Sequence, residues 1–150
     1  MNSFNNQKDK KVYRNFKECL ALGQEYELLA LDKIKKLHMV DVKQIQNNDN
    51  FKQIHHDFQT TDNLRFEVKA DFASEQTGNF FCEYAIMEKP SGLLISDADF
   101  YIVVSCGIFH LIDIDVLKKL TIGARIAKTR YGSEGYIINM DVIKANSQII

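Results

Sequence analysis

A short run of the sequence, LRFEVKAD at residues 64–71, alternates apolar and charged residues without a break. Successive side chains of a β-strand point to opposite faces, so this alternation predicts a strand with one apolar and one charged face. The charged face would carry Arg65, Glu67, Lys69 and Asp71. An acid and a lysine two positions apart on one face can form a solvated edge or contribute to a metal-dependent active site.

The elements that would position these side chains form a predicted β-hairpin. Residues 51–58 (FKQIHHDF) are the expected first arm and residues 64–72 (LRFEVKADF) the second. The turn would be formed by residues 61–63, because the Asn at its end tolerates a left-handed backbone conformation. In this register Thr60 lies opposite Leu64.

The same register places Asp57 directly opposite Glu67. Opposed residues share a face, with Cβ atoms about 4.5–5.5 Å apart, and like charges there are destabilising unless a cation lies between them. Lys69 follows on the same face. Two acids and a lysine are therefore expected to converge, although a register slip of one residue would separate them.

This trio has the composition that phosphodiester hydrolysis requires. Paired carboxylates bind Mg²⁺, a hard cation that prefers oxygen ligands. The metal polarises the phosphate and lowers the pKa of a bound water. A lysine beside it could orient or deprotonate that water and offset the charge that develops on the phosphorane.

Asp57 followed by Glu67-Val68-Lys69 resembles the motif of the PD-(D/E)XK nuclease superfamily. The order of a helix, an Asp strand and a Glu-x-Lys strand is similar to the superfamily core, and SGLLISDADFYIVV at 91–104 is similar to small phage-encoded and Holliday-junction-resolvase-like members. The resemblance covers roughly residues 20–120 and implies a restriction-endonuclease-like fold. One departure is that His56, where the superfamily often has proline, precedes Asp57.

The resemblance implies a role for each residue of the motif. Asp57 and Glu67 would bind Mg²⁺, for which Mn²⁺ can substitute, together with the carbonyl of Val68. Lys69 would position the attacking water. Glu27 would assist at the metal from the first helix, with Glu25 as the alternate. The implied activity is metal-dependent cleavage of DNA.

The remaining pattern predicts a single mixed α/β domain with a central β-sheet flanked by helices. Residues 1–14 are expected to be a flexible basic arm, and residues 15–150 the nuclease domain. A helix is expected over 15–39, with a core stripe of Tyr26, Leu29, Ala30, Ile34 and Leu37, and a polar loop over 41–50. Further strands are expected at 79–88, 99–105 and 108–113, then a helix capped by Asp113 that ends at Leu120, a short strand near GYIINM (135–140) and a terminal helical turn.

Charge is nearly balanced, with a formal net charge of −1, so nucleic acid would have to be bound by local basic clusters. One cluster lies near the start of the chain. The other consists of Lys118, Lys119, Arg125, Lys128 and Arg130, which are expected to contact DNA phosphates unless they form only a solvated face.

The size of the domain favours shape-selective substrates such as branched or junction DNA, and analogy suggests a homodimer. Three widely spaced cysteines and the lack of a long apolar run suggest a cytoplasmic protein, in the host cytoplasm if phage-encoded, without a membrane partner. The alternatives are a catalytically inactive nucleic-acid-binding or protein-interaction module on the same fold, and a structural domain whose charged hairpin face is only solvated. A zinc site from His55, His56 and Cys82 is disfavoured because the spacing does not support one.

Overall fold

The computed structural model of the protein describes residues 16–38, 42–44 and 54–150. The expected basic arm at residues 1–14 lies outside the described residues, as do 51–53 of the expected hairpin. The expected loop at 41–50 is partly wrong, because Val42–Gln44 form strand β1, which pairs antiparallel with strand β2 (Phe58–Thr60). Polar residues can form such an edge strand because pairing uses backbone groups.

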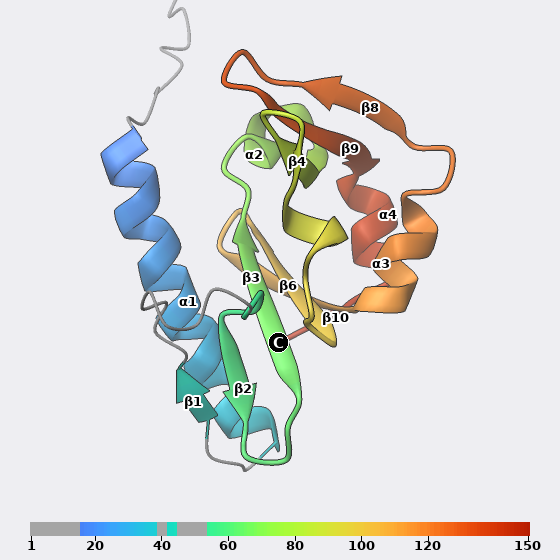
Figure 1. The fold of residues 1–150 in the computed structure, drawn as a ribbon. Helices are drawn as coiled ribbons and strands as arrows, with labels where there is room; N and C mark the ends of the chain where they lie inside the picture. The colour runs from blue at the N-terminus through green and yellow to red at the C-terminus, as the bar shows by residue number, and fades with distance from the viewer. Residues whose placement is uncertain (1–15, 39–41, 45–53) are drawn as a thin grey trace, which may run out of the picture.

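Helix α1 (Phe16–His38) packs on one face of the first sheet (Figure 1). Ala30 and Ile34 are fully buried against the sheet, as the apolar stripe predicted. Leu29 and Leu37, also assigned to that stripe, are instead 44% and 45% exposed. Residues four apart follow one another along a helix face, and only the narrow face through Ala30 and Ile34 reaches the sheet.

The first sheet has six strands in the order β1-β2-β3-β6-β7-β10. β3 and β6 are parallel, and the other neighbours are antiparallel. Beyond β1 and β2, its strands are β3 (Arg65–Ala70), β6 (Phe100–Ser105), β7 (Ile108–Asp113) and β10 (Gln148–Ile149).

The hairpin between β2 and β3 has the predicted register. Phe58 pairs with Phe66, and the Thr60 amide donates to the Leu64 carbonyl at 2.8 Å. Asn63, at the end of the turn, has φ 71°, the left-handed conformation expected of it. The first arm is shorter than predicted, because the carbonyl of His55 accepts hydrogen bonds from the Asp97 amide and the Ser96 hydroxyl and the residues before Phe58 follow that loop.

A second sheet packs against the first, with a shared core between them. The sequence did not predict it as a separate layer. Its four antiparallel strands have the order β5-β4-β9-β8. They are β4 (Asn79–Ile86), β5 (Lys89–Pro90), β8 (Arg125–Lys128) and β9 (Ser133–Asn139). The strand expected at 79–88 therefore belongs to this second sheet, because helix α2 (Ser74–Thr77) and Gly78, at φ 70°, turn the chain away after β3.

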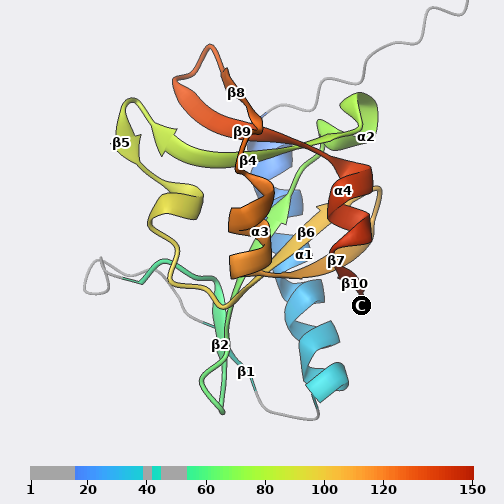
Figure 2. The ribbon, with the colours of Figure 1, turned by 90° about the vertical axis from the view of Figure 1, so that its right-hand side faces the viewer.

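Strand β6 is covered on both faces, as its apolar sequence predicted. On one face Ile102 and Val104 join a core with Ala30, Ile34 and Phe66. On the other, Tyr101 and Val103 join a core that includes Phe80 and Cys82 of β4. Figures 1 and 2 show α1 on one face of the first sheet and the second sheet on the other face. The remaining helices are η1 (Gly92–Leu94), α3 (Ile114–Leu120) and α4 (Met140–Ala145).

The predicted cap of α3 is confirmed, because the Asp113 carboxylate accepts from the Asp115 and Val116 amides at 2.7 and 3.3 Å. The chain is thus a mixed α/β domain, as its sequence predicted. None of the helices in the described part of the chain is long and apolar enough to cross a membrane.

Candidate active site

Two of the four charged side chains within residues 64–71 are committed to holding the fold. Arg65 pairs with Asp99, with Nη2 to Oδ1 at 3.1 Å and Nε to Oδ2 at 3.2 Å, while its amide donates to Oδ2 at 2.8 Å. The Asp71 carboxylate accepts from the amides of Ser74 at 3.1 Å and Phe81 at 2.8 Å. These contacts tie β3 to the loop before β6 and to the second sheet, so the charges available for chemistry are Glu67 and Lys69.

Glu67 and Lys69 form an ion pair on the exposed side of β3. Lys69 Nζ lies 2.6 Å from Glu67 Oε1, and the two side chains are 40% and 13% exposed, respectively. The buried neighbours Phe66 and Val68 point to the opposite face and anchor the strand in the core. The alternation of the sequence therefore holds the acid and the lysine together at an accessible surface.

Asp57 lies beside this pair, at the point where the chain enters β2. Its amide donates to the Phe66 carbonyl at 2.9 Å, and its Oδ2 accepts from the Val68 amide at 2.7 Å. The side chain is thus held against the backbone between Glu67 and Lys69. The predicted convergence of Asp57, Glu67 and Lys69 is present in the structure.

Glu27 approaches the same charges from α1. Burial and, to a smaller extent, Asp57 raise the pKa of this half-buried carboxyl to about 6, while Lys69 opposes the rise. Glu25, its alternate in the sequence, is exposed to solvent. The structure therefore favours Glu27 of the two acids, because it is the half-buried one and its charge interacts with those of Asp57 and Lys69.

The three acids and Lys69 perturb one another's titration. Burial raises the pKa of Glu67 to about 7; Lys69 opposes this shift, whereas Asp57 and Glu27 add to it. Burial also raises the pKa of Asp57, although the Val68 amide and Lys69 stabilise its charged form. Burial lowers the pKa of Lys69, but Glu67 outweighs it through charge and a hydrogen bond, so the pKa is raised. Concentrated negative charge of this kind is typical of functional sites.

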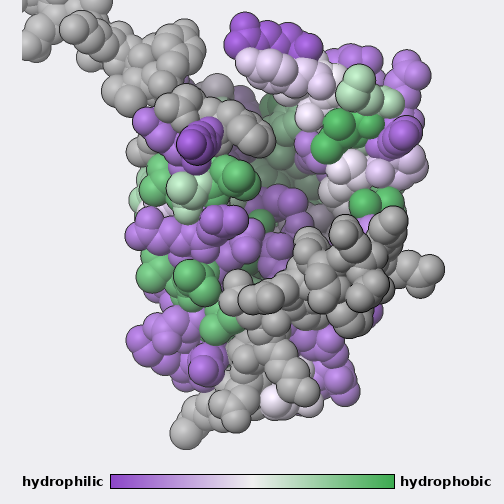
Figure 3. Space-filling view, turned by 60° about the vertical axis from the view of Figure 1, so that its left-hand side comes forward, coloured by the Kyte–Doolittle hydropathy of each residue, from purple (hydrophilic) through white to green (hydrophobic). Residues whose placement is uncertain are grey.

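A pocket of about 220 Å³ opens over this cluster. Its polar lining comes from His55, His56, Asp57, Glu67, Lys69, Glu83 and Ser91. In Figure 3 the face turned toward the viewer is hollowed near its centre, and hydrophilic side chains border the hollow. Asp57, Glu67 and Lys69 thus share one solvent-accessible recess, and Glu27 stands behind it without lining it.

The wall opposite β3 comes from β4 and the loop after β5. The Ser91 hydroxyl donates to Glu83 Oε1 at 2.7 Å. Gly92 has φ 47°, and a Cβ there would lie 2.2 Å from the Glu83 carbonyl oxygen, so only glycine permits this close approach. The hydrogen bond from Ser91 thus holds Glu83 at the wall of the recess.

Both histidines before Asp57 line the pocket. His56 is buried, and its Nδ1 lies 2.7 Å from Asp97 Oδ1, which ties it to the loop before β6. Cys82 is buried in the core on the other side of β4, where it cannot complete a zinc site with them.

The residues present match the chemistry of Mg²⁺ in part. Carboxylate oxygens of Asp57 and Glu67 are hard donors, and the acids exceed the one lysine beside them in charge. Within residues 16–38, 42–44 and 54–150, however, no three side chains of His, Cys, Asp or Glu are arranged as a preformed metal cluster. The donor set fits a cation that keeps several waters and takes few protein ligands, and the Val68 carbonyl stays a predicted ligand.

The basic residues expected to contact DNA lie on two separate elements. Lys118 and Lys119 are exposed on α3, whereas Arg125 and Lys128 are on β8. Lys128 pairs with Glu134 at 3.2 Å. Arg130 lies 4.8 Å from the ring centroid of Tyr131 and donates to its hydroxyl. Arg125 instead lines a second cavity, which the sequence did not reveal.

Comparisons with known proteins leave these features to be interpreted from their own geometry. The chain matches no protein-family model, and a search of curated proteins finds no significantly similar sequence.

Proposed function

We propose that the protein is a metal-dependent DNA endonuclease that hydrolyses phosphodiester bonds. The observation that carries the proposal is the shared recess in which Asp57 is bonded to the backbone between Glu67 and Lys69. Two carboxylates and a lysine at one open surface are the groups that this reaction requires.

In this proposal Asp57 and Glu67 hold Mg²⁺ or Mn²⁺, with the Val68 carbonyl as a further ligand. When bound, the metal supplies Lewis-acid polarisation of the phosphate and a water of lowered pKa. Glu27 adds negative charge behind Asp57 and supports the cation from α1. The hydrogen bond from the Val68 amide fixes the direction of the Asp57 carboxylate before substrate arrives.

Lys69 acts in its charged form, because Glu67 keeps its pKa raised. Its ammonium would orient the attacking water and stabilise the charge that builds on the phosphorane. The role expected of Lys69 is therefore electrostatic positioning, and proton abstraction would require Glu67 to be drawn away by a cation.

Lys118, Lys119, Arg125, Lys128 and Arg130 would bind DNA phosphates. By analogy with the superfamily that the motif resembles, the proposed substrate is branched or junction DNA and the proposed active form a homodimer.

The test is cleavage of labelled duplex, single-stranded, flap and four-way-junction DNA with Mg²⁺ or Mn²⁺. We expect Lys69→Met and Asp57→Asn each to lower the cleavage rate by at least about 100-fold, since each removes a charge in the reacting centre. Lys89→Met, an exposed lysine on β5, is the matched control and should leave the rate unchanged. A folded wild type that cuts none of these substrates, or an active Lys69→Met variant, would contradict the proposal.

A second candidate is a catalytically inactive nucleic-acid-binding module. The 2.6 Å ion pair between Glu67 and Lys69 favours it, because the lysine neutralises the Glu67 carboxylate without a metal ion. This module would bind DNA equally well in EDTA, and its affinity would fall steeply with salt. Gel-shift titrations with and without Mg²⁺, at two salt concentrations, separate the two functions.

A further inference from the structure

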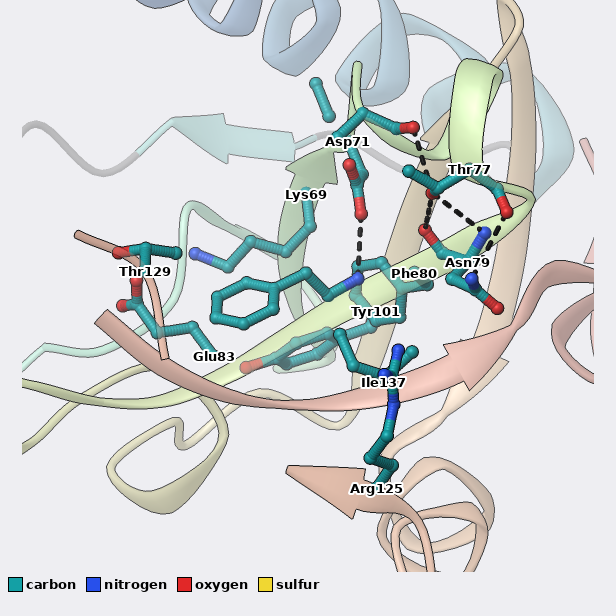
Figure 4. A pocket seen from close by; sticks show the side chains of 13 residues that line it. Lys69, Asp71, Thr77, Asn79, Phe80, Glu83, Tyr101, Arg125, Thr129 and Ile137 are labelled. Atoms are coloured by element: carbon teal, nitrogen blue, oxygen red, sulfur yellow. Dashed lines mark hydrogen bonds between the residues drawn. The ribbon is translucent and has the colours of Figure 1, made fainter. Parts of the chain in front are cut away.

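A second and larger cavity, of about 490 Å³, adjoins the candidate active site. Lys69 and Glu83 line both the cavity and the smaller pocket over Asp57 and Glu67. The cavity lies between the end of β3 and the second sheet, and Figure 4 shows the side chains that face it. Its volume falls in the range of about 300–1,000 Å³ that is typical of small-molecule sites.

The sheet side of the cavity is an apolar platform with a cation at its edge. Ile137 pairs with Phe81 on one neighbouring strand and with Arg125 on the other. Residues opposed in this way share a face, so the three form a row across β4, β9 and β8. Figure 4 shows Arg125 extending from β8 toward Ile137.

The ring of Phe81 is held in place from two sides. Its amide is bonded to Asp71 Oδ2 at 2.8 Å, which fixes the backbone. Its ring lies over Gly135, where an added Cβ would be only 2.7 Å from a ring carbon. An aromatic surface that is already fixed loses little freedom when a ligand stacks on it.

The lining of the cavity favours a ligand with a flat apolar part and an anionic group near Arg125. Both acids of the lining are engaged by hydrogen-bond donors: the Asp71 carboxylate accepts from two backbone amides, and Glu83 accepts from the Ser91 hydroxyl. The Arg125 side chain makes no hydrogen bond or ion pair with any residue that the structure describes. Lys69, Phe81, Tyr101 and Ile137 line the cavity together with it.

We propose that this cavity binds one unpaired nucleobase of the DNA substrate, stacked on Phe81, with Arg125 contacting a phosphate beside it. The inference rests on the proposed nuclease function and names its substrate class: DNA with an unpaired nucleotide next to the bond that is cut. A base has polarisable faces that stack on aromatic rings, and an unpaired base enters a pocket at a smaller cost than a paired one.

Binding of the base is tested without cleavage, in EDTA. The probe is a short DNA duplex with a single bulged 2-aminopurine, whose fluorescence is quenched by stacking; the protein has no tryptophan to interfere. We expect saturable quenching by the wild type, and an affinity about tenfold weaker for Phe81→Leu, which keeps an apolar side chain but removes the aromatic face. Phe72→Leu makes the same change at a ring that lines neither cavity and should bind as the wild type does.

Cleavage is then compared between the bulged duplex and the same duplex with an abasic residue at the bulge. We expect the wild type to cut the abasic substrate about tenfold more slowly than the bulged substrate. Phe81→Leu should cut both substrates at the same slow rate. Equal cutting of both substrates without saturable quenching would overturn the base-binding inference and leave the nuclease intact. Saturable, Phe81-dependent quenching without any cleavage would instead retain base binding and reject the proposed nuclease.

Discussion

Replacing Glu67 by glutamine should stabilise the folded protein while it removes activity. The pKa of Glu67 rises from 4.5 to about 7 on folding because the carboxyl is buried beside two other acids. The folded state therefore binds this proton more tightly than the unfolded state does. Stability is lost as pH rises from 4.5 through about 7, and the loss is complete above both pKa values.

The size of the effect follows from the two pKa values. Their difference corresponds to about 3 kcal/mol of unfolding free energy. Glutamine resembles the protonated acid, so Glu67→Gln should be about 1–3 kcal/mol more stable than the wild type at pH 8 and nearly equal to it at pH 4. For a chain of this length that corresponds to a rise in Tm of several degrees.

The measurement is urea and thermal unfolding of both proteins in EDTA at pH 4 and pH 8, followed by circular dichroism. Glu134→Gln is the control, because Glu134 forms a surface ion pair with Lys128 and its loss should change stability by less than about 1 kcal/mol. Added Mg²⁺ should stabilise the wild type at pH 8 and have a smaller effect on Glu67→Gln. A Glu67→Gln protein that is less stable than the wild type at pH 8 would show that the ion pair with Lys69 is structural and would refute the reasoning.

Three further outcomes are expected. Asp99→Ala should lower the unfolding free energy in urea by about 1–3 kcal/mol, because it leaves the Arg65 guanidinium and amide without their acceptor; Asp99→Asn should recover part of the loss. Gly92→Ala should cost more than about 1 kcal/mol, since its Cβ would collide with the Glu83 carbonyl, and unchanged stability would exclude this clash. Mg²⁺ affinity, measured by calorimetry, should weaken as pH falls from 8 to 5 and Glu67 becomes protonated; affinity independent of pH would argue against this carboxylate as a ligand.

The cluster of Asp57, Glu67 and Lys69 could be predicted from sequence because it depends on local pattern. Alternation within residues 64–71 assigns Glu67 and Lys69 to one face, and the short turn before it sets the register that brings in Asp57. Asp113 as a helix cap and β6 as a strand buried on both faces are also local properties. Each depends on side chains only a few residues apart.

Other assignments depended on partners distant in the chain. The alternation of residues 64–71 assigns Arg65 and Asp71 to the same charged face as Glu67, so it does not distinguish their roles from that of Glu67. Asp99, 34 residues from Arg65, and the Phe81 amide, 10 residues from Asp71, commit these two to the fold. The periodicity of one strand carries no information about such partners.

The sequence alone determined a mixed α/β domain with two acids and a lysine converging on one hairpin. Only the tertiary structure decided that β4 would begin a second sheet, that Glu27 and not Glu25 would face Asp57, and that a cavity floored by Phe81 would adjoin the site. The physical reason is that strand alternation and turn geometry act between near neighbours. The stacking of two sheets and the choice of a helix face depend on how the whole chain buries its apolar surface.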